Sequence, residues 1–230
     1  MHATPSLFVV ALPRSLSTVV YEQAAAALRL RSPLWTTAGE ILNGDRVVLS
    51  GSEEGSLKFT PPERSADFTR LLRFLDDVVH PTGAAYKDVV QPFAAAHWLR
   101  ERSLPVLYVR RPLADVAWSF ERAGWRYPIA AATEHGGDRE RLLAGLARAA
   151  RALAAIKQAV VLDFDDALDD EGALYDALRR LYSQAELQPI RYRDAAFVDY
   201  AREVRERRRD AHWQALDAAL RAIDERMTSD

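Results

Sequence analysis

A group of polar residues that could bind an anion follows an apolar run near the start of the chain. Residues 7–12 are all apolar, and the segment PRSLST (13–18) comes directly after them. From Val19 onward apolar residues recur at helical spacing, so the pattern predicts a strand buried in a parallel sheet, a short turn and a helix. A helix N-terminus has unpaired N–H groups and the positive end of the macrodipole, which stabilise a phosphate or sulfate group. Arg14 adds a positive charge, so the stretch predicts an anion-binding loop.

This loop lacks the GxxxxGK[ST] spacing of nucleoside triphosphatases, and a βα turn with an ordinary Ser or Thr cap is the alternative interpretation. The segment resembles the 5′-phosphosulfate loop of sulfotransferases, P-[KR]-S-G-[ST]-T, with Leu16 in the glycine position. The resemblance implies binding of 3′-phosphoadenosine 5′-phosphosulfate, with Arg14 donating to the bridging oxygen. The loop residues that it implicates are Arg14, Ser15, Leu16, Ser17 and Thr18.

A second stretch, VLYVRRPLADVAWSF (106–120), resembles the 3′-phosphate motif of the same family, R-[DN]-P-x-[DE]-x-x-x-S. Anchoring the motif on R-x-P selects Arg110, whereas counting back eight residues from Ser119 selects Arg111, so both arginines remain candidates. An arginine fork can bind a phosphate with two hydrogen bonds. We expect Pro112 at the first position of a helix. The alternative is that the two arginines are solvated charges at a strand end.

Transfer of a sulfuryl group requires a base that accepts the proton of the attacking acceptor. Resemblance to bacterial carbohydrate sulfotransferases favours Glu40, and His80 is the alternative, as in cytosolic members of the family. Lys87 lies in a predicted internal strand and either contacts the transferring sulfuryl oxygens or pairs with an acid such as Asp88. The resemblance also provides candidates in the C-terminal segment that would close over the adenosine, namely Tyr200, Arg207 and Trp213.

The elements that position these residues alternate along the chain. Strands are predicted at 7–12, 84–90, 104–109 and 159–164, and helices after 18, at 62–79, 91–102, 138–158 and 171–187. Residues 46–51 and 57–60 suggest a small hairpin, residues 129–136 a loop, and residues 199–227 a charged tail with an apolar stripe. This order predicts a three-layer α/β/α domain over residues 1–230 with a mainly parallel sheet. Its topology would be that of P-loop NTPases and sulfotransferases, with ligands at the carboxyl ends of the strands. The segment 160–182 resembles a late element of the family, which extends the resemblance over about residues 6–187.

Composition limits the function further. The 230 residues have a net charge of −2 and no cysteine, which argues against nucleic-acid binding and excludes disulfides and cysteine-bound metals. No positively charged region precedes the first apolar run, so we expect a cytoplasmic protein with no membrane contact. The combined expectation is a sulfotransferase that yields 3′,5′-adenosine bisphosphate, requires no metal and acts on a hydroxyl or amine of a small-molecule or sugar acceptor. A P-loop small-molecule kinase and a non-catalytic nucleotide-binding protein are the alternatives, and the oligomeric state stays open, a homodimer included.

Overall fold

The structure, a computed structural model, describes residues 4–32, 40–42, 59–63, 65–126 and 137–229. Four strands lie in these ranges: β1 Leu7–Ala11, β2 Ala85–Asp88, β3 Val106–Arg110 and β4 Ala159–Asp163. The helices are α1 Ser17–Ala27, α2 Ser65–Val78, α3 Pro92–Arg100, α4 Leu113–Arg122, α5 Asp138–Ala154, α6 Phe164–Asp169, α7 Glu171–Leu181, α8 Ala195–Arg207 and α9 Ala211–Ser229. None of the helices described is both long and apolar enough to span a membrane.

The sheet is parallel throughout and has the order β2-β1-β3-β4. All five residues of β1 are buried, as expected for a central strand covered on both faces. Val9 in β1 lies between Lys87 of β2 and Leu107 of β3. Glu40 forms a parallel bridge with Lys87 at the edge of β2 that β1 leaves free. The short segment 40–42 therefore extends the sheet beside β2.

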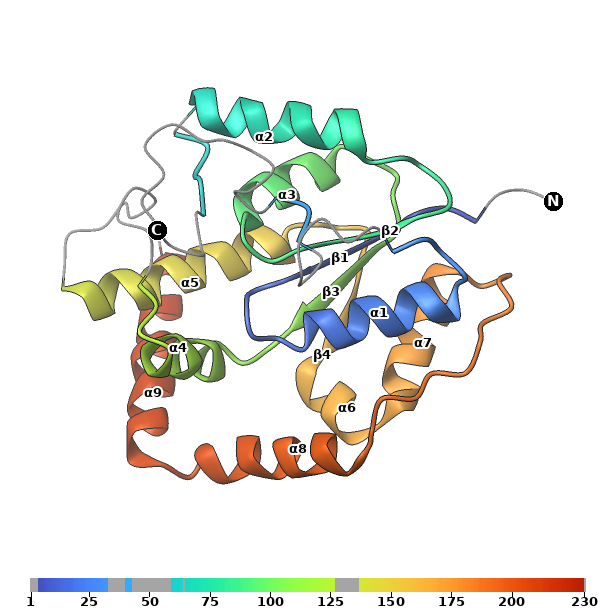
Figure 1. The fold of residues 1–230 in the computed structure, drawn as a ribbon. Coiled ribbons are helices and arrows are strands. Elements are labelled where there is room, and N and C mark those ends of the chain that lie inside the picture. The colour runs from blue at the N-terminus through green and yellow to red at the C-terminus, as the bar shows by residue number, and fades with distance from the viewer. Residues whose placement is uncertain (1–3, 33–39, 43–58, 64, 127–136, 230) are drawn as a thin grey trace.

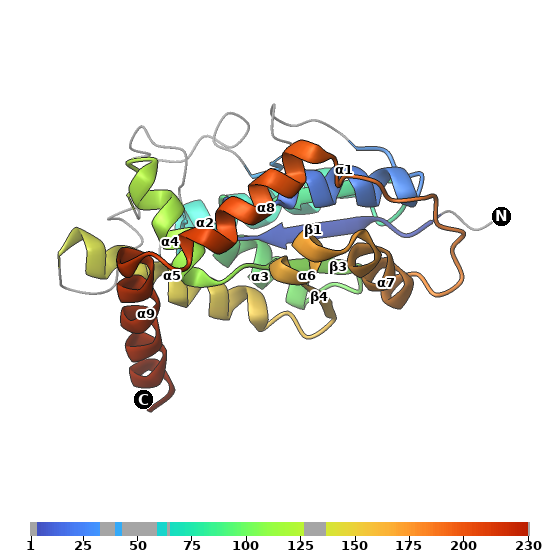
Figure 2. The ribbon, with the colours of Figure 1, turned by 90° about the horizontal axis from the view of Figure 1, so that it is seen from below.

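Helices cover both faces of this sheet (Figure 1). On one face α1 packs against β1 and β2, and α7 packs against β3 and β4. On the other face α3 packs against β1, and α5 lies against α3. The predicted three-layer α/β class with a parallel sheet is confirmed. Seen together, Figures 1 and 2 show α8 crossing the molecule below α6 and α4 before the chain turns into α9.

Several predicted boundaries were wrong. The helix predicted to reach residue 158 ends at Ala154, where the chain turns so that the Gln158 amide can donate to the carbonyls of Leu99 and Arg102. The helix predicted to reach 187 ends at Leu181, because Tyr182 leaves the helical conformation and its hydroxyl donates to the Pro5 carbonyl. Residues 164–169 form α6, which the sequence pattern did not predict. The predicted hairpin, except residues 59–60, and the loop at 129–136 lie outside the described residues.

Candidate active site

The loop after β1 adopts the backbone conformation of the glycine that it lacks. Leu16 has φ 58° and ψ 11°, and Arg14 has φ 66°, so both residues are left-handed. This conformation costs about 1–2 kcal/mol for a residue with a side chain. The Leu16 side chain packs against an apolar cluster on α6 and α8 that includes Phe164 and Phe197, and this contact offsets part of the cost. The loop thus keeps the predicted turn without glycine.

The first turn of α1 has no side-chain cap. Leu16 is the N-cap residue, and it makes no side-chain hydrogen bond to the helix. The alternative interpretation of an ordinary Ser or Thr cap is therefore wrong. The Ser15 hydroxyl is buried and has no hydrogen-bond partner among the described residues. Unpaired N–H groups and a free hydroxyl are the donors that an anion needs at a helix N-terminus.

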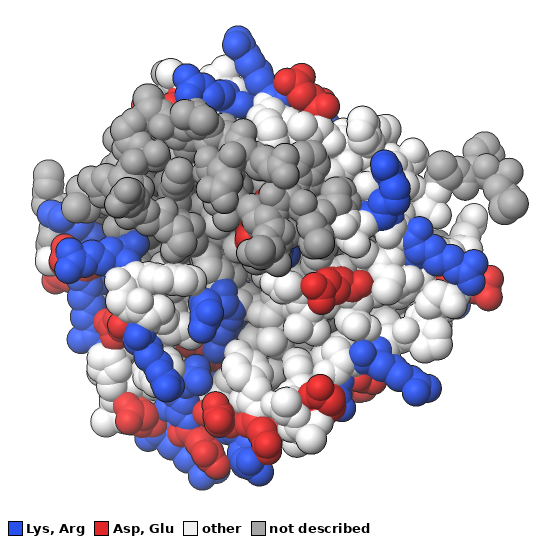
Figure 3. Space-filling model, in the orientation of Figure 1, with Lys and Arg blue, Asp and Glu red and all other residues white. Residues whose placement is uncertain are grey.

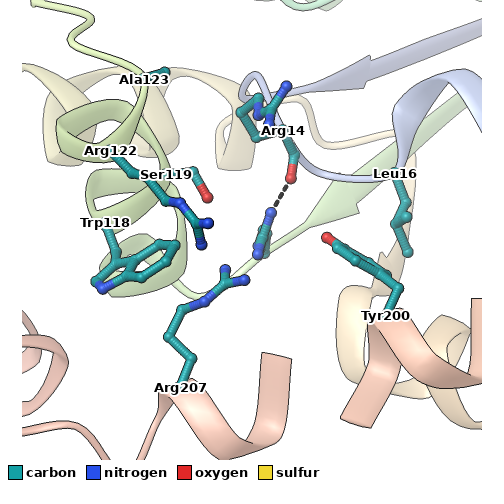
Figure 4. Close-up of a pocket in the computed structure, with 9 residues that line it drawn as sticks. Arg14, Leu16, Trp118, Ser119, Arg122, Ala123, Tyr200 and Arg207 are labelled. Atoms are coloured by element: carbon teal, nitrogen blue, oxygen red, sulfur yellow. Dashed lines mark hydrogen bonds between the residues drawn. The ribbon is translucent and has the colours of Figure 1, made fainter. Parts of the chain in front are cut away.

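A cavity of about 500 Å³ opens beside this loop, between the loop, α4 and α8 (Figure 4). Its described lining consists of Arg14, Leu16, Arg111, Trp118, Ser119, Arg122, Ala123, Tyr200 and Arg207. Four of these residues are arginines, and none of the described lining residues carries a carboxylate. Elsewhere on the face shown in Figure 3, basic and acidic side chains are mixed. The cavity is therefore a local concentration of positive charge suited to an anionic ligand.

The two adjacent arginines after β3 have different environments. Arg110 is exposed and forms two hydrogen bonds with Asp163 on the neighbouring strand, at 2.7 and 2.9 Å. Arg111 is buried, with 1% of its side chain exposed, and it donates to the carbonyl of Arg14, the dashed line in Figure 4. Its Nε and one terminal nitrogen have no hydrogen-bond partner among the described residues, and burial lowers the pKa of Arg111. Arg111, eight residues before Ser119, thus faces the cavity, and Arg110 does not line it.

Asp115 fixes the wall of the cavity that α8 forms. Its side chain is completely buried, and it accepts hydrogen bonds from Arg208 at 2.6 Å and from the Trp213 indole at 2.7 Å. The Arg111 Nε lies 3.6 Å from the same carboxylate. Arg208 also binds Asp165 on α6. Burial lowers the pKa of Arg208, but its hydrogen bonds to the two aspartates outweigh burial and raise the pKa. The junction of α8 and α9 is thereby held on α4.

The network around Asp115 explains where the C-terminal candidates lie. Tyr200 and Arg207 line the cavity, as a segment closing over a nucleotide would require. Trp213 does not line the cavity, because its indole is engaged by Asp115. Sequence reasoning missed Asp115, although it stands four residues after Arg111, at the acidic position of the motif when that arginine is the anchor. It also missed Trp118 and Arg122, and no motif signal marked either residue.

A second group connects the edge of the sheet to the start of α1. Lys87 is fully buried, its Nζ lies 3.2 Å from the Glu40 carboxylate, and it donates to the Thr18 hydroxyl at 2.8 Å. Lys87, which we expected to contact the sulfuryl oxygens, therefore contacts both Glu40, the predicted base, and the Thr18 hydroxyl of the loop. Ser17 is buried in the first turn of the same helix.

Asp88, the other acid considered as a partner of Lys87, binds the backbone instead. Asp88 accepts hydrogen bonds from the backbone N–H groups of Leu42 and Gln91, at 3.1 and 2.8 Å. Burial, aided by the charge of Glu40, raises the pKa of Asp88 to about 7. The alternative base His80 precedes β2, where Pro81 pairs with the residue before β1. It therefore lies at the end of the sheet opposite to the loop.

Pro112 lies immediately before α4 rather than at its first position, so the expectation of a proline inside the first turn was wrong by one residue. Its carbonyl accepts the N–H groups of Asp115 and Val116, and this hydrogen bonding starts the helix one residue later. Within the described residues no group of three or more His, Asp or Glu side chains is arranged to hold a metal ion.

Comparisons with known proteins find similar structures but no similar sequence. No family model and no curated protein matches the chain. A sulfotransferase domain from the curacin biosynthetic pathway is 13% identical, with a TM-score of 0.47, over 86% of this chain and 78% of that chain. A sulfotransferase from Alicyclobacillus acidocaldarius is also 13% identical, with a TM-score of 0.41, over 96% of both chains. At this identity and these TM-scores, neither likeness assigns a function, which has to be argued from the residues of the site.

Proposed function

We propose that this protein is a sulfotransferase that moves a sulfuryl group from 3′-phosphoadenosine 5′-phosphosulfate to a hydroxyl or amine of a small-molecule or sugar acceptor. The observation that carries the proposal is the contact between the loop after β1 and the arginine-lined cavity. Arg111 lines that cavity and donates to the carbonyl of Arg14 in the loop. Two features that could each bind an anion therefore adjoin each other, which supports a ligand with a phosphosulfate at one end and a phosphate at the other.

The residues present fit such a ligand. The uncapped first turn of α1 and the unpaired Ser15 hydroxyl would hold the 5′-phosphate. Arg111, whose buried Nε has no hydrogen-bond partner among the described residues, would bind the 3′-phosphate with Ser119 and Arg207. Tyr200, which lies across the cavity beside Leu16 in Figure 4, would flank the nucleoside.

In the proposed reaction the acceptor oxygen or nitrogen attacks sulfur, and the bond between sulfur and the bridging oxygen breaks in line. The electron pair of that bond stays on the leaving phosphate, so negative charge develops on the bridging oxygen and on the phosphate. Lys87, held between Glu40 and Thr18, would stabilise the transferring group. Glu40 would take the proton of the acceptor.

Arg14 needs one change of conformation for its role. Its guanidinium lies 5.6 Å from the Trp125 ring centroid, and Figure 4 shows it directed away from Arg122 and Arg207. The side chain is exposed, so it can rotate toward the bridging oxygen without disturbing the core. Replacement of Arg14 by alanine should abolish most turnover and leave the thermal unfolding of the protein unchanged.

A calorimetric titration tests the proposal. We expect 3′,5′-adenosine bisphosphate to bind in the absence of magnesium. The R111Q variant should bind it at least about tenfold more weakly, because a charged hydrogen bond is worth about 1.5–3 kcal/mol. The R110Q variant, which among the described residues loses the exposed pair with Asp163, is the matched comparison and should bind like the parent protein. Magnesium-dependent ATP binding would instead favour the small-molecule kinase, and binding of neither nucleotide would contradict a sulfotransferase.

A further inference from the structure

Trp118 holds two guanidinium groups at the mouth of the cavity. The Arg207 guanidinium carbon lies 3.9 Å from the Trp118 ring centroid, and that of Arg122 lies 5.2 Å from it. Arg122 lies one turn further along α4, and Arg207 lies on α8, so cations from two separate helices contact the same indole ring. Figure 4 shows both side chains reaching toward the same space, beside the Ser119 hydroxyl. An aromatic face attracts such cations and restricts where they can lie.

These two guanidinium groups retain their hydrogen-bonding capacity. Among the described residues, neither Arg122 nor Arg207 has an ion-pair or hydrogen-bond partner, in contrast to Arg208, which binds two aspartates. Burial lowers the pKa of Arg207, and the nearby charge of Arg122 lowers it further. Together with the unpaired donors of buried Arg111, three like charges face one cavity. Such an arrangement is stabilised when an anion with more than one charge enters.

We propose that Arg122, oriented by Trp118, is a specificity-determining residue that makes this site select nucleotides carrying a 3′-phosphate. The inference rests on the proposed function, to which it adds a residue that no sequence motif indicated. A phosphate monoester carries about −1.5 to −2 charges at pH 7, and its three oxygens can accept from several arginine forks at once. Arg122 thus adds a third guanidinium to Arg111 and Arg207, which would bind the 3′-phosphate. It contributes nothing to the affinity for a nucleotide that carries only a 5′-phosphate.

The test compares the binding of 3′,5′-adenosine bisphosphate with that of 5′-AMP by calorimetry. In R122Q we expect the affinity for the bisphosphate to fall by about tenfold or more, and that for 5′-AMP to change by less than about twofold. R122K should recover only part of the loss, because lysine keeps the charge but lacks the planar fork. W118L should also lower the bisphosphate affinity, because it removes the support of both guanidinium groups.

The matched control is R126Q, which removes the same charge four residues later. Arg126 is largely exposed and faces Asp138 at 3.9 Å, and it does not line the cavity. Its removal should leave both affinities unchanged. An unaltered ratio of the two affinities in R122Q, or an equal loss for both nucleotides, would overturn the inference. A parent protein that binds no bisphosphate would instead contradict the proposed function, so the two failures are distinguishable.

Discussion

Replacement of Arg208 by glutamine should destabilise the protein more than any exposed arginine substitution on the same helices. Arg208 joins the α8–α9 junction to Asp115 on α4 and Asp165 on α6. The Asp115 side chain is completely buried, and 24% of the Arg208 side chain is exposed. Without Arg208, the partners that the described residues leave to the buried carboxylate are the Trp213 indole and the Arg111 Nε at 3.6 Å.

The magnitude follows from the difference between the two ion pairs. Breaking a buried ion pair by removing one partner costs about 3–5 kcal/mol. The pair with the half-exposed Asp165 adds little, because water screens it. Since Asp115 keeps two neighbours, we expect a loss near the lower end, about 3 kcal/mol. For a chain of this length, that loss corresponds to a fall in Tm of about 6–12 °C.

Urea unfolding followed by circular dichroism measures this loss. R205Q is the matched control, because Arg205 on α8 pairs with Asp169 on α6, and both side chains are at least half exposed. That substitution should cost less than about 1 kcal/mol. The double variant R208Q/D115N should lose less stability than the sum of the two single variants, because they break one interaction. Equal midpoints for R208Q and R205Q would refute the assignment of Asp115 as the residue that anchors the C-terminal helices.

Substitutions at three further positions test other parts of the site. E40Q should lower turnover by about a hundredfold or more and leave the affinity for 3′,5′-adenosine bisphosphate unchanged; an unchanged rate would transfer the role of base to another group. Because the pKa of Asp88 is raised to about 7 from an unfolded value of about 3.9, its contribution favours the folded state below about pH 4 and is lost as the pH rises through 7. The free energy of unfolding of D88N, measured by urea unfolding between pH 5 and 8, should therefore fall less with pH than that of the parent, and parallel curves would contradict the shift. For Leu16, L16A should be less stable than L16G in thermal unfolding, because alanine keeps the left-handed strain and loses the packing, whereas glycine is relieved of the strain; the reverse order would show that this strain is negligible.

The strands and their order along the chain could be predicted because β1, β3 and β4 are short, largely apolar runs, and because apolar residues flank Lys87 and Asp88 in β2. The central run, Leu7 to Leu12, is buried throughout. The choice between Arg110 and Arg111 could not be made from the pattern, because a shift of one residue at a strand end turns a side chain to the other face. The structure makes the choice: β4 places Asp163 opposite Arg110, and Arg110 binds Asp163 instead of lining the cavity.

The wall formed by α8 could not be predicted, because it depends on contacts between residues far apart in the sequence. The arginine-rich segment 202–209 is typical of a solvated helix face. The fully buried carboxylate of Asp115, 93 residues earlier, draws Arg208 inward and brings Arg207 to the cavity. No local pattern records such a pairing. The leucine at position 16 was a departure whose consequence also needed the structure, since its support comes from α6 and α8.

Leu16 makes the sequence of the loop after β1 depend on the sequence of α8. A glycine turn needs nothing from the rest of the chain, so a homologue with glycine at position 16 could change its tail helix freely. Here the turn relies on the apolar cover that Phe197 and Val204 provide. Among homologous sequences, positions 16, 197 and 204 should therefore covary: leucine at the first should accompany apolar residues at the other two, and glycine should release them.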